Sequence, residues 1–172
     1  MANKQALREL QTRLAERLSA AKSEPAARSW LAVECNARGF LFPLREAGEI
    51  FSVGRLQPVP YSQRWFLGVA NLRGHLHGVV DLAGFIGVKQ AEASREHAYL
   101  VGFNQNLDLN CVLLVDRLCG LRSEADLTAE PATSSPRPAF VGTNYRDAAS
   151  RRWQELKLSE LAADEAFLRI AS

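Results

Sequence analysis

The chain has 172 residues, 47% of them hydrophobic and 23% charged, which predicts a globular protein with one core or two small joined cores. Its 21 basic and 19 acidic residues give a net charge of +2 and are spread along the chain, so no basic face for nucleic acid is indicated. No apolar run approaches the ~18 residues of a membrane span, and the charged start "MANKQALREL" is unlike a signal peptide. We therefore expect a cytoplasmic protein with no direct membrane insertion.

Residues 3–22 carry an apolar stripe at steps of three and four, formed by Leu7, Leu10, Leu14, Leu18 and Ala21. This spacing predicts an amphipathic helix. The helix could pack on its own domain or meet a partner, and the sequence leaves both open. The proline and small residues of "SEPAA" at 23–27 then predict a short linker.

The period changes from 3.6 to 2 after this linker, which predicts a mostly β protein. The predicted strands lie in short apolar runs at 29–35, 40–45, 49–53, 75–82, 97–103 and 108–116. "CNARGF" at 35–40 predicts a hairpin, because Asn and Gly flank a short connection between two runs. "PVP" at 58–60 lacks two backbone donors, so we place it at an edge or in a loop.

The last third of the chain is less regular. Residues 124–150 contain three of the seven prolines and few aliphatic side chains, so we expect mainly loop there. A short strand is predicted over 153–158 and one short helix over 159–170. Short strands, a long loop and terminal helices together suggest small barrels decorated by helices.

Catalytic and metal-binding patterns are sparse. Phosphate-binding, nucleophile-elbow and zinc-protease motifs are missing from the sequence, and Cys35, Cys111 and Cys119 have neither ligand nor disulfide spacing. His75 and His77 would share one face of a strand, but a metal would need a third ligand, and Asp81 would lie roughly 13 Å further along. We expect no catalytic residue, no metal and no cofactor, and three small buried cysteines.

"NLRG" at 71–74 has Asn first and Gly fourth, as a type I turn favours. Arg73 is the unusual member, because a guanidinium on a tight turn beside apolar segments needs a carboxylate partner. Glu49 is one candidate and Glu46 is another.

Four segments follow one another along the chain: "EI" at 49–50, "VP" at 59–60, "WFLGVANLRGHLHGVVDL" at 65–82 and "LLVDRLCGL" at 113–121. In this order they resemble the successive motifs of the CheW family, the adaptor proteins of bacterial chemosensory arrays, and the resemblance covers about residues 29–163. It implies two small five-stranded β-barrel subdomains that share a core. It also implies a non-enzymatic adaptor that couples a methyl-accepting chemoreceptor to the regulatory domain of a CheA-type histidine kinase.

The resemblance further implies an ion pair between Glu49 and Arg73 near the receptor-facing side. The partner-binding residues carried over from it are Glu49, Ile50, Gly68, Asn71, Leu72, Arg73 and Gly74. As an adaptor of this kind, the protein would be recruited from the cytoplasm to membrane-associated receptor arrays.

The chain departs from the family pattern in two places. His75 and His77 are polar where that strand is usually apolar, and Gly78 stands where a proline is common. A helix and linker over 1–28 also precede the CheW-like domain, which we place at 29–170. The long loop and the C-terminal segment resemble the PilI branch, which serves type IV pilus twitching motility with a PilJ-type receptor.

Two other functions stay open. One is an adaptor of a flagellar or other chemosensory system. The other is a small-barrel nucleic-acid binder, which would need exposed aromatic side chains among basic residues. Phe40, Phe42 and Trp65 instead lie in apolar surroundings, so we expect no nucleic acid partner.

Overall fold

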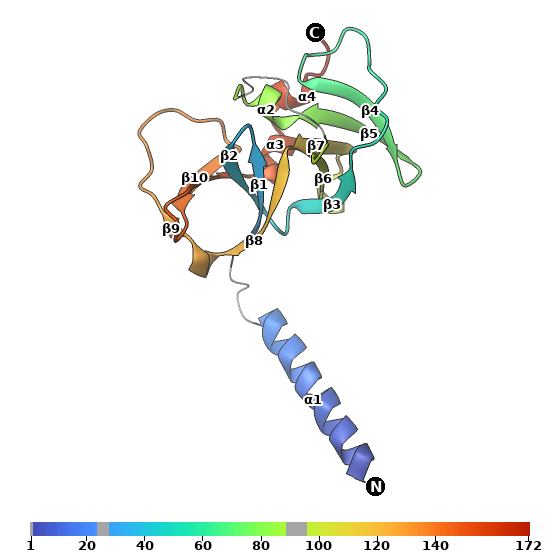
Figure 1. Ribbon diagram of the computed structural model, residues 1–172, viewed down its shortest axis with the longest axis vertical. Helices are drawn as coiled ribbons and strands as arrows, with labels where there is room; N and C mark the ends of the chain where they lie inside the picture. Colours follow the sequence, from blue (N-terminus) through green and yellow to red (C-terminus); the bar gives the residue numbers. More distant parts are fainter. Residues whose placement is uncertain (1, 24–27, 89–95) are drawn as a thin grey trace.

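Two curved β-sheets and a separate N-terminal helix make up the computed structural model, which describes residues 2–23, 28–88 and 96–172 (Figure 1). The expected mostly β fold is confirmed. The predicted linker at 23–27 falls almost entirely outside the described residues.

The first sheet has six strands in the order β8-β1-β2-β11-β10-β9. They span Arg117–Ser123 (β8), Ser29–Cys35 (β1), Arg38–Pro43 (β2), Arg152–Leu156 (β11), Val141–Arg146 (β10) and Thr128–Ala129 (β9). Neighbours are antiparallel except β2 and β11, and the sheet curls into a ring (Figure 1). The predicted hairpin between β1 and β2 is confirmed: Asn36 and Ala37 form its turn with φ of 49° and 63°.

The second sheet has five strands in the order β3-β6-β7-β5-β4. They span Ala47–Ser52 (β3), Tyr99–Phe103 (β6), Cys111–Val115 (β7), His75–Asp81 (β5) and Phe66–Leu72 (β4). Only β5 and β7 run parallel. The resemblance implied two barrels of five strands each. The second sheet has five strands, and the first has six because it includes the two-residue β9.

The two sheets share one hydrophobic core, as the resemblance implied. Phe40 and Phe42 of the first sheet belong to the same buried cluster as Val101 and Leu113 of the second sheet. Each sheet also has its own smaller cluster, one around Trp30 and Trp153 and the other around Leu100, Val112 and Val79. The sheets therefore do not slide past each other without breaking a common core.

Short helices complete the fold. They are α2 (Leu82–Phe85), α3 (Leu158–Ala162) and α4 (Glu165–Leu168), with 3-10 turns at Gln105–Leu107 (η1) and Glu124–Asp126 (η2). The single helix expected over 159–170 is wrong, because Asp164 starts a new helix by accepting a hydrogen bond from the backbone N–H of Phe167 at 2.9 Å.

The expectation of mainly loop over 124–150 is partly wrong, because β9 and β10 lie within it. In β10 only Tyr145 is buried, and the other residues are half-buried or exposed. The strand therefore lacks the apolar alternation by which sequence reasoning finds strands. β8 was missed for the same reason, since none of its residues is buried. Residues 58–60 lie outside the strands, as expected.

Helix α1 (Ala2–Ser23) stands apart from both sheets (Figure 1). Leu7, Leu10 and Leu14 are 57%, 57% and 53% exposed. Of the two interpretations left open by the sequence, packing on the chain's own domain is therefore not observed. An apolar stripe remains without a cover among the described residues.

Candidate partner-binding site

The hairpin between β4 and β5 carries the "NLRG" segment. Leu72 pairs with His75, which leaves Arg73 and Gly74 as a two-residue turn with φ of 50° and 81°. Two positive φ values are typical of a type I′ hairpin turn, so the expected type I turn is wrong. Asn71 lies within the strand, and its Oδ1 accepts a hydrogen bond from the N–H of Gly74 at 3.0 Å. The hydrogen bond from Gly74 to Asn71 thus fixes the shape of the turn that carries Arg73.

Strand β3 presents Glu49 at an irregularity in its pairing with β6. The register shifts between Ala47 and Ile50, and a Cβ on Gly48 would lie 2.3 Å from the carbonyl oxygen of Phe103. Only glycine allows β6 to come this close at that point. The shift places Glu49 on the side of the strand that faces the β4–β5 hairpin, where its carboxylate meets Arg73.

Arg73 Nη1 and Glu49 Oε1 form an ion pair. The two side chains are 74% and 42% exposed, so the guanidinium does not rest on buried surface as the sequence argument assumed. Glu46, the other candidate partner, is engaged elsewhere: its Oε1 accepts a hydrogen bond from the N–H of Ser159 at 2.8 Å. That N–H belongs to the first turn of α3, so Glu46 helps cap this helix.

The ion pair lies at the rim of an open hollow of about 750 Å³. Three segments line it: β3 around Glu49 and Phe51, the β4–β5 hairpin, and the connection 104–110 between β6 and β7. The hairpin contributes His75 and His77, and the ring centroids of His77 and Phe51 are 6.1 Å apart. The hollow is therefore lined by polar groups: two carboxylates, a guanidinium, two imidazoles and several amides. Such a lining suits binding to a polar surface of a partner protein.

Comparison with known proteins identifies the family. Residues 29–166 match the CheW-like domain. The chain belongs to the CheW-like family. This family consists of adaptor and scaffold proteins of chemosensory systems rather than enzymes, and the fold described above is the CheW-like fold.

Two relatives are similar in sequence to this CheW-like chain. Protein PilI of Pseudomonas aeruginosa is 29% identical over 154 residues, which cover 86% of this chain and 84% of PilI. Chemotaxis protein CheW of Rhizobium meliloti is 31% identical over 74 residues, or 43% of this chain and 46% of that protein. The crystal structure of scaffolding protein TtCheW from Thermoanaerobacter tengcongensis superposes with a TM-score of 0.62 at 16% identity, covering 79% of this chain and 88% of TtCheW.

The residues predicted to bind a partner fall into two groups in this CheW-like fold. Glu49, Leu72 and Arg73 line the hollow, Asn71 and Gly74 shape the turn beside it, and Ile50 is 39% exposed on the neighbouring position of β3. Gly68 is different, because it is buried. Its φ is 131°, and a Cβ there would lie 2.1 Å from the carbonyl oxygen of Gln57. Gly68 thus acts by letting the chain around Gln57 pair with Val69, not by presenting a surface.

Sequence reasoning missed Phe51 and the polar residues of 104–110 as parts of this site. The run "NQNLDLN" between two strongly apolar strands was the available signal. It marks a polar connection, but its position beside Glu49 depends on the pairing of β3 with β6.

Metal binding at the histidines finds no support in the residues described. Nowhere among them do three His, Cys, Asp or Glu side chains gather as a metal site would need. His77 Nδ1 instead lies 3.1 Å from the carbonyl oxygen of His75, and Asp81 is buried. Cys35 and Cys111 are buried free thiols as expected, whereas Cys119 is half-buried. Burial raises the pKa of the Cys111 thiol to about 12 and raises that of Cys35 further.

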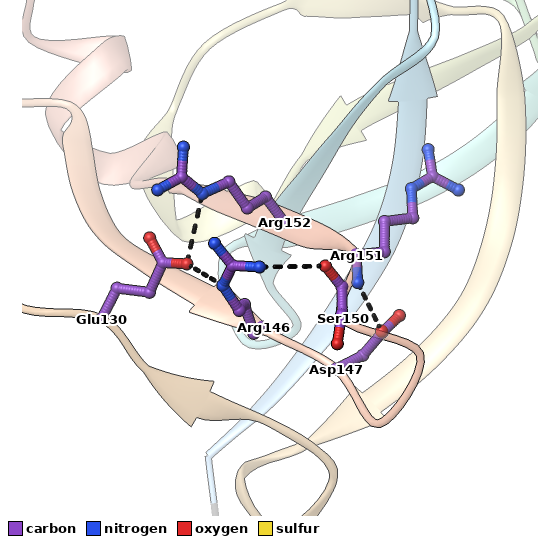
Figure 2. Close-up of polar contacts among 6 residues, drawn as sticks. All are labelled: Glu130, Arg146, Asp147, Ser150, Arg151 and Arg152. Atoms are coloured by element: carbon purple, nitrogen blue, oxygen red, sulfur yellow. Dashed lines mark hydrogen bonds and ion pairs between the residues drawn. The ribbon is translucent and has the colours of Figure 1, made fainter.

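A second charged cluster joins Glu130, which follows β9, to residues of β10, β11 and the turn between them (Figure 2). Glu130 Oε1 accepts hydrogen bonds from Nε of Arg146 at 2.5 Å and Nε of Arg152 at 3.2 Å. Asp147 accepts from the backbone of Arg151 at 3.0 Å and from Nε1 of Trp153 at 3.0 Å. The hydrogen bond from Arg152 is the main cause that holds the pKa of Glu130 below its ordinary range. The hydrogen bond from Trp153 does the same for the pKa of Asp147. This cluster fixes the β10–β11 hairpin.

Within residues 2–23, 28–88 and 96–172, every helix is too short or too polar to cross a bilayer.

Proposed function

We propose that this chain couples a methyl-accepting chemoreceptor to the regulatory domain of a CheA-type histidine kinase. The observation that carries this proposal is the exposed Arg73–Glu49 ion pair at the rim of an open hollow, in a chain of the CheW-like family. An ion pair with this much exposure adds little to the free energy of unfolding. Its two charged groups are instead available to bind complementary charges on a partner surface.

In this proposal, the receptor tip binds the surface formed by the β4–β5 hairpin and β3. Its contact residues are Glu49, Ile50, Asn71, Leu72, Arg73 and Gly74, while Gly68 supports the hairpin from within. The kinase binds apolar surface elsewhere on the barrels. Residues 29–170 form the CheW-like domain that makes these contacts, and residues 1–28 are an addition to it.

We place the protein in a type IV pilus system that controls twitching motility, with a PilJ-type receptor. The similarity to PilI supports this choice, because it extends over 86% of the chain, whereas the similarity to the Rhizobium CheW protein extends over 43%. Cytoplasmic adaptor molecules would then be recruited to the membrane-associated receptor array. An adaptor of a flagellar or other chemosensory system is the second candidate.

A nucleic-acid-binding barrel is disfavoured by the packing of Phe40, Phe42 and Trp65, the aromatic side chains considered for base stacking. Phe40 and Phe42 are buried in the shared core, and Trp65 packs against Phe85 and Phe167 at centroid distances of 5.0 and 6.1 Å. The two phenylalanine rings are therefore closed to bases, and the Trp65 ring is engaged by two other aromatic rings.

The proposal is tested by titrating the full chain with the purified kinase regulatory domain and, separately, with a receptor cytoplasmic fragment of the same cell. We expect saturable binding to each and a ternary complex that co-elutes in gel filtration. An absence of binding to both partners at high micromolar concentration would remove the proposal. A salt-sensitive shift with a single-stranded oligonucleotide would favour the barrel alternative instead.

A further inference from the structure

Two histidines line the hollow beside the ion pair, and the proposed function gives them no role. His75 and His77 both lie on β5, directly after the turn that carries Arg73, and all three residues line the hollow. Alternate residues of a strand point to the same face of a sheet, so the two imidazoles share one side of β5. His75 is exposed and His77 is half-buried. The hairpin therefore brings three side chains that can carry positive charge to one wall of the hollow.

The contacts of His77 fix what its ring offers to a partner. Its Nδ1 lies 3.1 Å from the carbonyl oxygen of His75, and its ring centroid lies 6.1 Å from that of Phe51. A carbonyl oxygen only accepts hydrogen bonds, so Nδ1 carries the hydrogen of the neutral ring. Nε2 is then an acceptor in the neutral ring and a donor in the protonated ring. Protonation of His77 thus reverses the hydrogen-bonding character of this nitrogen.

The other ionisable groups of the hollow come from each element around it. Glu49 on β3 and Asp108 on the connection 104–110 are acidic, and Arg73 on the hairpin is basic. At the start of β7, burial raises the pKa of the Cys111 thiol to about 12, so this thiol stays neutral. The lining therefore has a net charge of −1 with neutral histidines and +1 with both histidines protonated. Histidine is the side chain that ordinarily changes its charge between about pH 5 and about pH 8.

The positions of these charges favour an acidic partner at the hairpin wall. The printed ion pair joins Glu49 to one guanidinium nitrogen of Arg73, and a guanidinium has several N–H donors. A partner carboxylate beside Arg73 would accept hydrogen bonds from those donors and from protonated imidazoles. A partner lysine or arginine in the same place would instead be repelled by Arg73, and more strongly once the histidines are protonated.

We propose that His75 and His77 act with Arg73 as a proton-dependent binding site for an acidic segment of the receptor tip, so that receptor binding strengthens as the pH falls. The inference rests on the proposed function for the choice of the receptor. It gives a specificity-determining role to two side chains by which β5 departs from the family pattern. Receptor binding then takes up protons, because a partner that prefers the protonated hollow must itself favour protonation.

The test uses the full chain and the receptor cytoplasmic fragment. Their affinity is measured by titration calorimetry at about pH 5.5 and about pH 8, at either end of the range in which histidine ordinarily titrates. Repeating each titration in two buffers of different ionisation enthalpy measures the protons taken up on binding.

Two variants make the comparison specific. H75Q/H77Q keeps two polar side chains in the hollow but removes both titrating groups. H97Q is the matched control, because His97 is exposed, precedes β6 and is not among the residues that line the hollow. We expect the gain in affinity from high to low pH to be about three- to tenfold larger for the wild type and H97Q than for H75Q/H77Q. Proton uptake should fall in H75Q/H77Q alone.

Three outcomes would overturn the inference. An equal pH dependence in the wild type and H75Q/H77Q, with receptor binding intact, would remove the histidines and leave the proposed function standing. A gain smaller in the wild type than in H75Q/H77Q would show that a basic segment of the receptor occupies the hollow. If the wild type binds the receptor fragment at neither pH, the proposed receptor coupling and this inference fail together.

Discussion

Arg73 and Glu49 join the two ends of the five-stranded sheet. Glu49 lies on β3 and Arg73 on the hairpin after β4, and these strands are the first and last of the order β3-β6-β7-β5-β4. They meet because the sheet curls, as the contact between Phe51 of β3 and His77 of β5 also indicates. The ion pair therefore lies where the two outer strands of the curled sheet approach each other.

Reversing the charge at Arg73 should affect coupling more than folding. R73E places two carboxylates together, but both positions are exposed, so we expect a loss of only about 0 to 1 kcal/mol in the free energy of unfolding. Binding to the receptor fragment should weaken by about tenfold, because a charge on the binding surface is inverted. The swap E49R/R73E should recover part of this affinity. Unchanged receptor affinity in R73E would remove Arg73 from the proposed binding surface.

Replacing Gly68 should destabilise the fold. The G68A variant puts a Cβ 2.1 Å from the carbonyl oxygen of Gln57 at a backbone φ of 131°, so the chain around Gln57 must move. We expect a loss of about 2 to 4 kcal/mol in urea unfolding. G54A is the matched control, because nothing lies within 4 Å of a Cβ there. Equal stability of the two variants would contradict the close approach at Gly68.

The Glu130 cluster should make stability depend on acid. The pKa of the Glu130 carboxyl is lowered in the folded state, mainly by the hydrogen bond from Arg152. The charged carboxylate therefore favours folding at neutral pH. This contribution is complete above the carboxyl pKa of the unfolded chain and is lost as the pH falls through the lower folded value. We expect E130Q to flatten the fall in melting temperature over that acid range. A melting curve as steep in E130Q as in the wild type would exclude this cluster as its source.

Thiol labelling should separate the three cysteines. Cys35 and Cys111 are buried and their pKa values are raised by burial, so neither forms the reactive thiolate near neutral pH. Iodoacetamide should therefore modify only the half-buried Cys119 in the native protein, and all three cysteines in urea. Mass spectrometry counts the carbamidomethyl groups added. Rapid labelling of Cys35 in the native protein would contradict this prediction and show that the core opens more readily than its packing indicates.

Local patterns predicted most of the strands. β1 agrees with its predicted range because the apolar content is high from Ser29 to Cys35, and the hairpin at Asn36 follows from turn chemistry. Strand β10 was missed because it buries a single residue, Tyr145. Its place in the sheet comes from pairing with β11 and β9, which no local pattern records.

The sequence by itself determined the amphipathic helix, the mostly β character, the CheW-like motifs and the two candidate carboxylate partners of Arg73. Each of these depends on residues that are near one another in the chain. Only the tertiary structure decided between Glu49 and Glu46, assigned Gly68 to a buried contact and left the leucines of α1 uncovered. The choice of Glu49 depends on how the sheet curls, and the engagement of Glu46 depends on where α3 packs, because both bring together residues that are far apart in sequence.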